Sequence, residues 1–222
     1  MEPIPTFFLE PTDRVHRQLR RYASDGECPL PAGYHNGWAF LDIIERPKPA
    51  PGEYELAEPH LDHADERWPK TCECGYVFDP ADNWQIFTNR LYRRIDNGQE
   101  MTLRDAPPGA MYFADWMIEN WDKMNLEVPQ PWGPGPDGHF LVVKCPPLGH
   151  EWNVDARASN CDKKQDNAHR CWVRHGDPKT GKVTVDKAGL TCNAGAGSIL
   201  VGKEGTPSFW HGHLIDGWLR TC

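Results

Sequence analysis

Two histidines and two cysteines lie within a short stretch of the sequence and offer the ligand types that zinc prefers. They are His60, His63, Cys72 and Cys74, and Gly75 directly follows the second cysteine. Zinc takes four nitrogen or sulfur ligands in a tetrahedral arrangement, and chains supply them as short pairs on tight turns. Glycine suits such a turn because it has no Cβ atom to clash with the backbone. The segment therefore predicts a zinc site.

The spacing of the cysteines bears on what kind of zinc site this is. Cys72 and Cys74 resemble a zinc knuckle shortened by one residue, since the usual spacing places two residues between the cysteines. The competing interpretation is a pair of free buried cysteines, with the histidines on a hydrated loop. Four protein ligands fill a tetrahedral metal and leave no position for water. We therefore expect a structural zinc ion here, not a catalytic one.

A second group of possible ligands lies in the C-terminal half of the chain. Its members are Cys145, His150, Cys192, His211 and His213. His211 and His213 would point to the same side of a strand, because strand side chains alternate between the two faces. An open metal site here, with Glu151 as base, would suit a zinc-dependent hydrolase. The sequence favours the alternative, a strand with ordinary histidines and a structural glutamate.

Familiar enzyme motifs do not occur in the sequence. It contains no H-E-x-x-H, no G-x-S-x-G and no P-loop, and the glycines of residues 195–198 lack the P-loop lysine. The zinc deaminase signature is also absent. The sequence therefore leans toward a protein that is not an enzyme.

Composition favours a turn-rich chain with a thin aliphatic core. The chain has 222 residues, long enough for one large domain or two small ones, and its mean hydropathy is -0.68. Twenty glycines and 21 prolines indicate many turns and few long helices, while ten tryptophans carry much of the apolar surface. Such a chain gains stability from an additional staple such as a bound metal.

Charge and the N-terminal residues restrict the expected partners and location. The net charge of -8 argues against nucleic acid, and the basic run of Arg14, Arg17, Arg20 and Arg21 is interpreted as the solvated face of a short helix. The first nine residues do not form a signal peptide, and no stretch is long and apolar enough to span a membrane. We expect a protein that is cytoplasmic when made, or carried in a virion, and that does not bind membranes.

The eight cysteines fit a reducing compartment, where thiols more often bind metals than form disulfides. Cys161 and Cys171 could close a loop by a disulfide in an oxidising setting, and the sequence leaves their state open.

Three segments are expected along the chain. Residues 1–59 form an extended arm with a short helix between Thr12 and Gly26, a strand at 38–44 and a proline-rich linker at 46–52. Residues 60–127 hold the zinc-knuckle-like segment, a hairpin turning at Asn97-Gly98 and a helix at 109–121. Residues 128–222 form a β-rich domain with strands at 140–144, 151–154, 171–174, 183–185, 198–201 and 213–219. The predicted class is α+β and β-rich, with a small barrel or sandwich in the C-terminal half.

Five tryptophans lie in the strand-rich half and admit two interpretations. They are Trp132, Trp152, Trp172, Trp210 and Trp218. Buried tryptophan supplies a large contact area, so core packing explains most of them. Exposed, coplanar indole rings would instead indicate a carbohydrate-binding module, because sugar rings stack on them.

Four sequence segments carry a resemblance to a known group of proteins. They are WPKTCECGY at 68–76, CWVRHG at 171–176, AGAGSI at 194–199 and WHGHL at 210–214. They resemble uncharacterised proteins encoded by phages and prophages, and the second half is similar to a small phage-associated domain of unknown function. Leu148 departs from that pattern, which favours a cysteine there.

The resemblance implies a phage setting and no particular activity. Together with the predicted metal site, it suggests a non-enzymatic, zinc-stapled structural or accessory binding protein of a phage or its virion. Its expected partners are proteins, either copies of itself or phage structural subunits.

Overall fold

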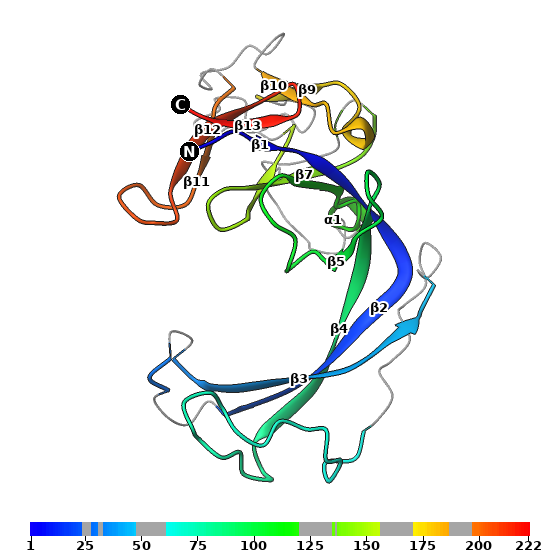
Figure 1. Ribbon diagram of the computed structural model, residues 1–222, viewed down its shortest axis with the longest axis vertical. Helices are drawn as coiled ribbons and strands as arrows, with labels where there is room; N and C mark the ends of the chain where they lie inside the picture. Colours follow the sequence, from blue (N-terminus) through cyan, green and yellow to red (C-terminus); the bar gives the residue numbers. More distant parts are fainter. Residues whose placement is uncertain are drawn as a thin grey trace. The chain divides into compact units, whose positions relative to one another are not determined.

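The computed structural model describes residues 1–23, 28–30, 33–47, 61–119, 135, 137–155, 171–186 and 197–222. This part of the chain is β-rich, as predicted, and is arranged in several sheets, none of which closes on itself (Figure 1). Its helical content is one short α-helix, α1 (Trp116–Glu119), and one 3-10 turn at Pro178–Thr180. The described residues therefore do not bear out the α part of the predicted α+β class.

The chain divides into two compact units. One unit consists of Met1–Glu10 with Arg93–Cys222, and the other is Pro11–Tyr92. These boundaries differ from the predicted ones at residues 59 and 127. The proline-rich linker at 48–52 and most of the stretch 128–138 lie outside the described residues.

The unit that holds both termini contains most of the strands. They are β1 (Ile4–Pro5), β5 (Glu100–Thr102), β6 (Ala110–Phe113), β7 (Leu141–Cys145), β8 (His150–Asn153), β9 (Val173–His175), β10 (Thr184–Asp186), β11 (Ile199–Val201), β12 (Trp210–Ile215) and β13 (Trp218–Thr221). One sheet has the order β1-β13-β12-β11, β9 pairs with β10, and β6, β7 and β8 are consecutive antiparallel neighbours. Buried side chains of these strands form one hydrophobic core.

Two expectations about this unit are corrected in detail. The predicted strand at 213–219 is a hairpin, in which β12 and β13 are joined by Asp216 and Gly217, both with positive φ. The predicted helix at 109–121 begins instead as strand β6, and α1 is its only helical part among the described residues.

The tryptophans of the strand-rich half mostly serve this core. Trp210 is buried in it, and Trp152 and Trp172 pack against it with their rings inclined by 69°. Trp218 is 40% exposed, and Trp132 lies outside the described residues. Their arrangement favours core packing over a flat sugar-binding platform.

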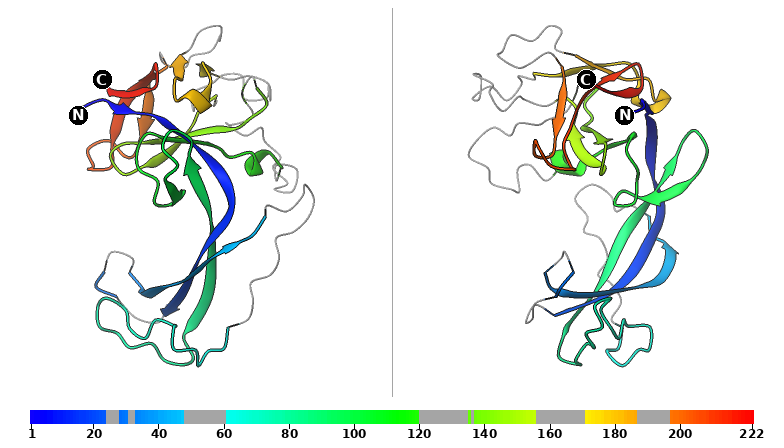
Figure 2. Two further views of the ribbon diagram at one scale, coloured as in Figure 1. Left: turned by 45° about the vertical axis from the view of Figure 1, so that its right-hand side comes forward. Right: turned by 60° about the vertical axis from the view of Figure 1, so that its left-hand side comes forward.

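The unit Pro11–Tyr92 is built on three long strands, two of which are β2 (Phe7–Ala23) and β4 (Asn83–Arg94). The first residues of β2 and the last residues of β4 belong to the other unit. Strand β3 (His35–Glu45) pairs with β2 in antiparallel register from Arg14 opposite Glu45 to Ala23 opposite His35. β4 is the neighbour of β2 on its other side (Figure 2). The predicted strand at 38–44 is confirmed within β3, and the predicted hairpin is confirmed where β4 turns into β5 at Gly98.

Strand β2 replaces the helix predicted between Thr12 and Gly26. Val15, Arg17 and Leu19 are buried while the residues between them are half-exposed, which is the alternation of a strand with one covered face. Arg17 can occupy a buried position because its guanidinium pairs with Asp42 on β3, with Nε 2.7 Å from Oδ1. The basic run is therefore not a solvated helix face.

No helix in the described part of the chain is long and apolar enough to cross a membrane.

Candidate metal centre

Four side chains of the unit Pro11–Tyr92 bring possible metal ligands together. They are Cys28, His35, Cys72 and Cys74, and one ligand atom from each lies within 4.8 Å of all the others. The Sγ atoms of Cys28 and Cys72 are 4.0 Å apart, and His35 Nδ1 is 3.2 Å from Cys74 Sγ. Ligand atoms on a tetrahedral zinc, with Zn–S of about 2.3 Å and Zn–N of about 2.0 Å, stand roughly 3.5–3.8 Å apart. The cluster therefore has the size of a tetrahedral metal site.

The first pair of ligands comes from the connection between β2 and β3. Cys28 lies before a turn in which the Gly33 amide donates to the Leu30 carbonyl at 2.9 Å. Gly33 has a φ of +72°, a conformation that residues with a Cβ atom rarely adopt. His35 follows as the first residue of β3. This turn brings the imidazole back toward the thiol.

The second pair lies on a tight turn of the segment before β4. Thr71 and Val77 form a β-bridge, and within it the Cys72 amide donates to the Tyr76 carbonyl at 2.8 Å. The Gly75 amide donates to the Cys72 carbonyl at 2.9 Å, and Gly75 has a φ of +94°. This is the knuckle-like turn predicted from the Cys-x-Cys-Gly sequence.

The two pairs meet because this turn packs closely on β3. A Cβ atom at Gly37 would lie 2.7 Å from Phe78 Cε2, 2.9 Å from Pro69 Cβ and 3.1 Å from the Thr71 carbonyl oxygen. The backbone of β3 can approach this closely only where it has no side chain. The guanidinium of Arg21 holds the same segment by donating to the Asp79 carbonyl and lying over the Phe78 ring at 5.5 Å.

The surroundings of the cluster are apolar and ordered by ring contacts. Cys28, Cys72 and Phe78 are buried together, and Cys74 and Tyr76 are among the half-buried residues packed against them. The His35 ring stacks on the Tyr76 ring at 4.0 Å with an angle of 6° between the planes. This stacking restricts the orientation of the imidazole plane.

The surroundings shift the pKa values of the Cys72 and Cys28 thiols in opposite directions. Burial raises the pKa of Cys72, but hydrogen bonds from the amides of Asn36 and Cys74 and from the side chains of Cys74 and His35 outweigh it and bring the pKa to about 6. The Asn36 amide donates to Cys72 Sγ at 3.4 Å, the kind of contact that stabilises a metal-bound thiolate. Burial raises the pKa of Cys28. A metal would supply the positive charge that this thiol needs in order to ionise.

The predicted first set of ligands is placed as follows. Cys72 and Cys74 lie in the cluster, and His60 lies outside the described residues. His63 is not a member of the cluster, and its ring packs against that of Trp84 at 3.6 Å. Sequence reasoning missed Cys28 and His35, although the turn residues between them were a signal that the two could converge.

The second predicted group does not come together among the described residues, where the cluster above is the one set of three or more close ligands found. Cys145 is fully buried, and burial raises its pKa to about 12. Its thiol therefore stays protonated at neutral pH, whereas a metal ligand has to be a thiolate. His150 lies opposite it on β8, followed by Glu151, and the rings of His211 and His213 on β12 are 6.5 Å apart. Cys192 and Cys161 lie outside the described residues, while Cys171 is buried.

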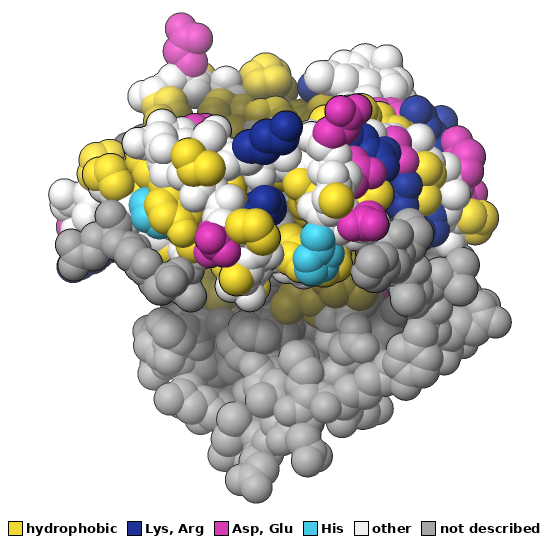
Figure 3. Space-filling view, turned by 90° about the horizontal axis from the view of Figure 1, so that it is seen from below, with side chains coloured by type: hydrophobic (Ala, Val, Ile, Leu, Met, Phe, Trp, Pro, Cys, Tyr) yellow, Lys and Arg dark blue, Asp and Glu magenta, His cyan; other side chains and the backbone are white. Residues whose placement is uncertain are grey.

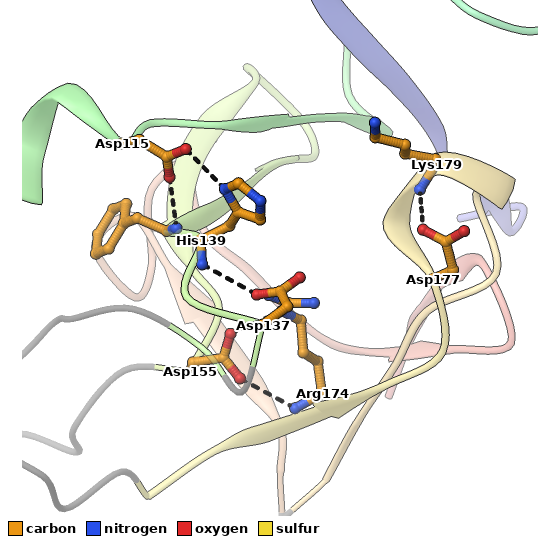
Figure 4. A network of polar contacts seen from close by, with 8 residues as sticks. Asp115, Asp137, His139, Asp155, Arg174, Asp177 and Lys179 are labelled. Carbon is orange, nitrogen blue, oxygen red and sulfur yellow. Dashed lines mark hydrogen bonds and ion pairs between the residues drawn. The ribbon is translucent and has the colours of Figure 1, made fainter. Parts of the chain in front are cut away.

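A separate polar network occurs in the unit that holds the termini (Figure 4). Arg174 is 4% exposed at its side chain and pairs with both Asp155 and Asp137, its Nε lying 2.8 Å from Asp155 Oδ2. Nearby, His139 Nδ1 contacts Asp115 Oδ2 at 2.8 Å. The network joins β9 to the residues that flank β7 and β8, which is a structural role.

No protein-family model, no curated protein and no solved structure matches the chain.

Proposed function

We propose that the protein binds one zinc ion through Cys28, His35, Cys72 and Cys74, and that this ion is a structural staple of a non-enzymatic binding protein. The observation that supports the proposal is the closeness of three thiols and one imidazole from two separate parts of the chain. Thiolate and imidazole ligands suit zinc, whereas magnesium and calcium prefer oxygen ligands.

The number of ligands supports a structural role. Three cysteines and one histidine complete a tetrahedral zinc site, so no position remains for the water that a catalytic zinc needs. The ion would tie the start of β3 to the turn at Cys72–Cys74. The unit would thereby gain a fixed connection that its small apolar cluster around Phe78 supplies only in part.

The proposed partners are proteins in a phage setting, on the strength of the sequence resemblance. In Figure 3, the described residues of this face intersperse basic, acidic and hydrophobic side chains. Such a mixed surface suits a protein partner better than a phosphate backbone, which calls for a continuous basic surface. Finding the protein in purified phage particles by mass spectrometry would support this setting.

The metal proposal is tested by metal content and thermal stability. The full chain, purified without chelators, is expected to contain about one zinc per molecule, and a strong chelator should lower its melting temperature. Cys28→Ser and His35→Ala should both lose most of the zinc. Cys222→Ser is the matched control, because Cys222 is an exposed cysteine outside the cluster.

A second comparison separates the two possible ligand sets. His63→Ala should keep its zinc, because His63 packs on Trp84 and not in the cluster. Full zinc content in Cys28→Ser together with its loss in His63→Ala would refute the proposed ligand set. Absence of zinc from the wild-type protein, even after purification and reconstitution with excess zinc, would refute the proposal as a whole.

A further inference from the structure

A small cavity lies beside the segment that carries Cys72 and Cys74. Its volume is about 90 Å³, and it is lined by Arg21, His63, Trp68, Pro80 and Trp84. All five residues belong to the unit Pro11–Tyr92. The cavity thus forms between β2, the start of β4 and the segment 61–82, which the proposed zinc would hold in place.

Aromatic rings form the walls of the cavity and support one another. The rings of Trp68 and Trp84 meet edge to face, with centroids 5.3 Å apart and planes inclined by 77°. The His63 ring contacts Trp84 at 3.6 Å, also edge to face. Trp68 is buried, and its Nε1 donates to the Asp62 carbonyl at 2.9 Å. These contacts preorganise the walls for a flat, apolar group.

Arg21 brings a positive charge to this aromatic cavity. Its guanidinium donates to the Asp79 carbonyl and lies over the Phe78 ring, and among the described residues no carboxylate pairs with it. Arg17 and Arg67 in the same unit do have such partners, Asp42 and Asp65. A guanidinium has five N–H donors, so Arg21 retains donors for an incoming anion.

We propose that this cavity binds a small planar carboxylate, such as an aryl carboxylate or the same group on a larger ligand. The carboxylate would accept hydrogen bonds from Arg21, which can bind such a group through two donors, and the flat part would contact the indole walls. A cavity of about 150 Å³ encloses a benzene ring. The volume here is smaller, so a ligand would insert only one end and leave the rest outside.

This inference rests on the proposed function, because the zinc would hold the segment that supplies Trp68 and Pro80. The probe is benzoate, titrated into the zinc-loaded full chain and followed by ligand-observed NMR. Benzamide is the neutral control of the same shape. Charged hydrogen bonds of this kind are worth about ten-fold to a hundred-fold in affinity, so benzoate should bind at least about ten-fold more tightly than benzamide.

The variants test the assigned role of Arg21. Arg21→Gln should abolish the preference for benzoate, and Arg21→Lys should keep part of it, because lysine retains the charge without the two-donor fork. Arg220→Gln, at an exposed position on β13, is the control for a general change of charge and should keep the full preference. Zinc content and melting temperature are measured on every variant, so that loss of folding is recognised.

The possible results separate this inference from the zinc proposal. If the zinc-loaded wild-type protein binds benzoate no better than benzamide, or if folded Arg21→Gln retains the preference, the inference is overturned and the zinc site stands. If the protein holds no zinc and still prefers benzoate through Arg21, the cavity assignment is supported and the zinc proposal fails. Binding of acetate as tight as that of benzoate would overturn the aromatic part of the assignment.

Discussion

A single added methyl group at Gly37 should weaken both the fold and the metal site of the unit Pro11–Tyr92. An alanine Cβ there would stand 2.7 Å from Phe78 Cε2 and 2.9 Å from Pro69 Cβ. Carbon atoms in good contact are about 3.5–4.0 Å apart, so the segment has to move away by roughly 1 Å. The third neighbour, at 3.1 Å, is the Thr71 carbonyl oxygen, which belongs to the backbone and cannot rotate aside. That carbonyl directly precedes Cys72.

The size of the effect follows from two opposing contributions. Overpacking of this kind costs about 1–3 kcal/mol, while replacing glycine by alanine within a strand contributes about 0.5–1 kcal/mol in the opposite direction. These two ranges leave a net loss in the free energy of unfolding of about 0–2.5 kcal/mol, centred on about 1 kcal/mol. For a unit of this length, each 1 kcal/mol moves the melting temperature by about 4–8 °C. For the central value, we expect Gly37→Ala to melt about 4–8 °C below the wild-type protein.

The assay combines thermal unfolding with the rate at which zinc passes to a chromogenic chelator. Gly37→Ala should release zinc faster, and its effect on melting should shrink in the chelator-treated protein, where the segment is no longer tied to β3. Phe40→Ala is the control on the same strand, because Phe40 is 61% exposed. Unchanged melting and unchanged zinc release in Gly37→Ala would refute the close packing described here.

Three further predictions concern charges and thiols elsewhere in the chain. Arg174→Leu should lower the free energy of unfolding by about 3–5 kcal/mol in urea, because it leaves two carboxylates without their buried partner; a loss below about 1 kcal/mol would contradict this. The Arg17 guanidinium holds the pKa of Asp42 below its usual value, so the stabilisation is complete above about pH 4 and is lost as the pH falls through the lower, folded-state pKa. The melting temperatures of the zinc-free wild-type protein and Asp42→Asn should therefore converge as the pH falls below about 4, and a constant gap would argue against the pairing. Finally, burial raises the pKa of Cys145 to about 12, so a thiol reagent at neutral pH should label exposed Cys222 and spare Cys145 in the native protein, as peptide mapping would show.

Local signals in the sequence were enough to predict the β-rich class and several strands. The Asn97-Gly98 pair predicted the turn in which Gly98 adopts a positive φ, and the apolar run before Cys145 predicted the buried strand β7. Strand β2 was not predicted because Arg17, a charged residue, occupies one of the buried positions in the strand's alternation of buried and more exposed residues. A charged residue breaks the expected apolar pattern unless its partner is known. That partner, Asp42, is brought opposite by strand pairing and not by any local spacing.

The same difference between local and long-range signals decided which ligands of the candidate metal site could be predicted. Cys72 and Cys74 could be predicted because one turn and one glycine bring them together. Cys28 lies 44 residues before Cys72, and its approach depends on the β2–β3 pairing and on the side-chain-free position at Gly37. Sequence reasoning chose His60 and His63 instead, because they are near the cysteines in the chain.

The distance along the chain also explains why the site would be useful to the protein. A metal held entirely within residues 60–74 would close only a short loop, whereas one that joins Cys28 to Cys72 restricts a much longer stretch of the unfolded chain. The entropy removed from the unfolded state grows with the length of the closed loop, although only slowly. The larger benefit is positional, since the long connection fixes the start of β3 against the segment that carries Trp68 and Pro80. A zinc at this place would therefore stabilise the unit and shape its cavity through the same four ligands.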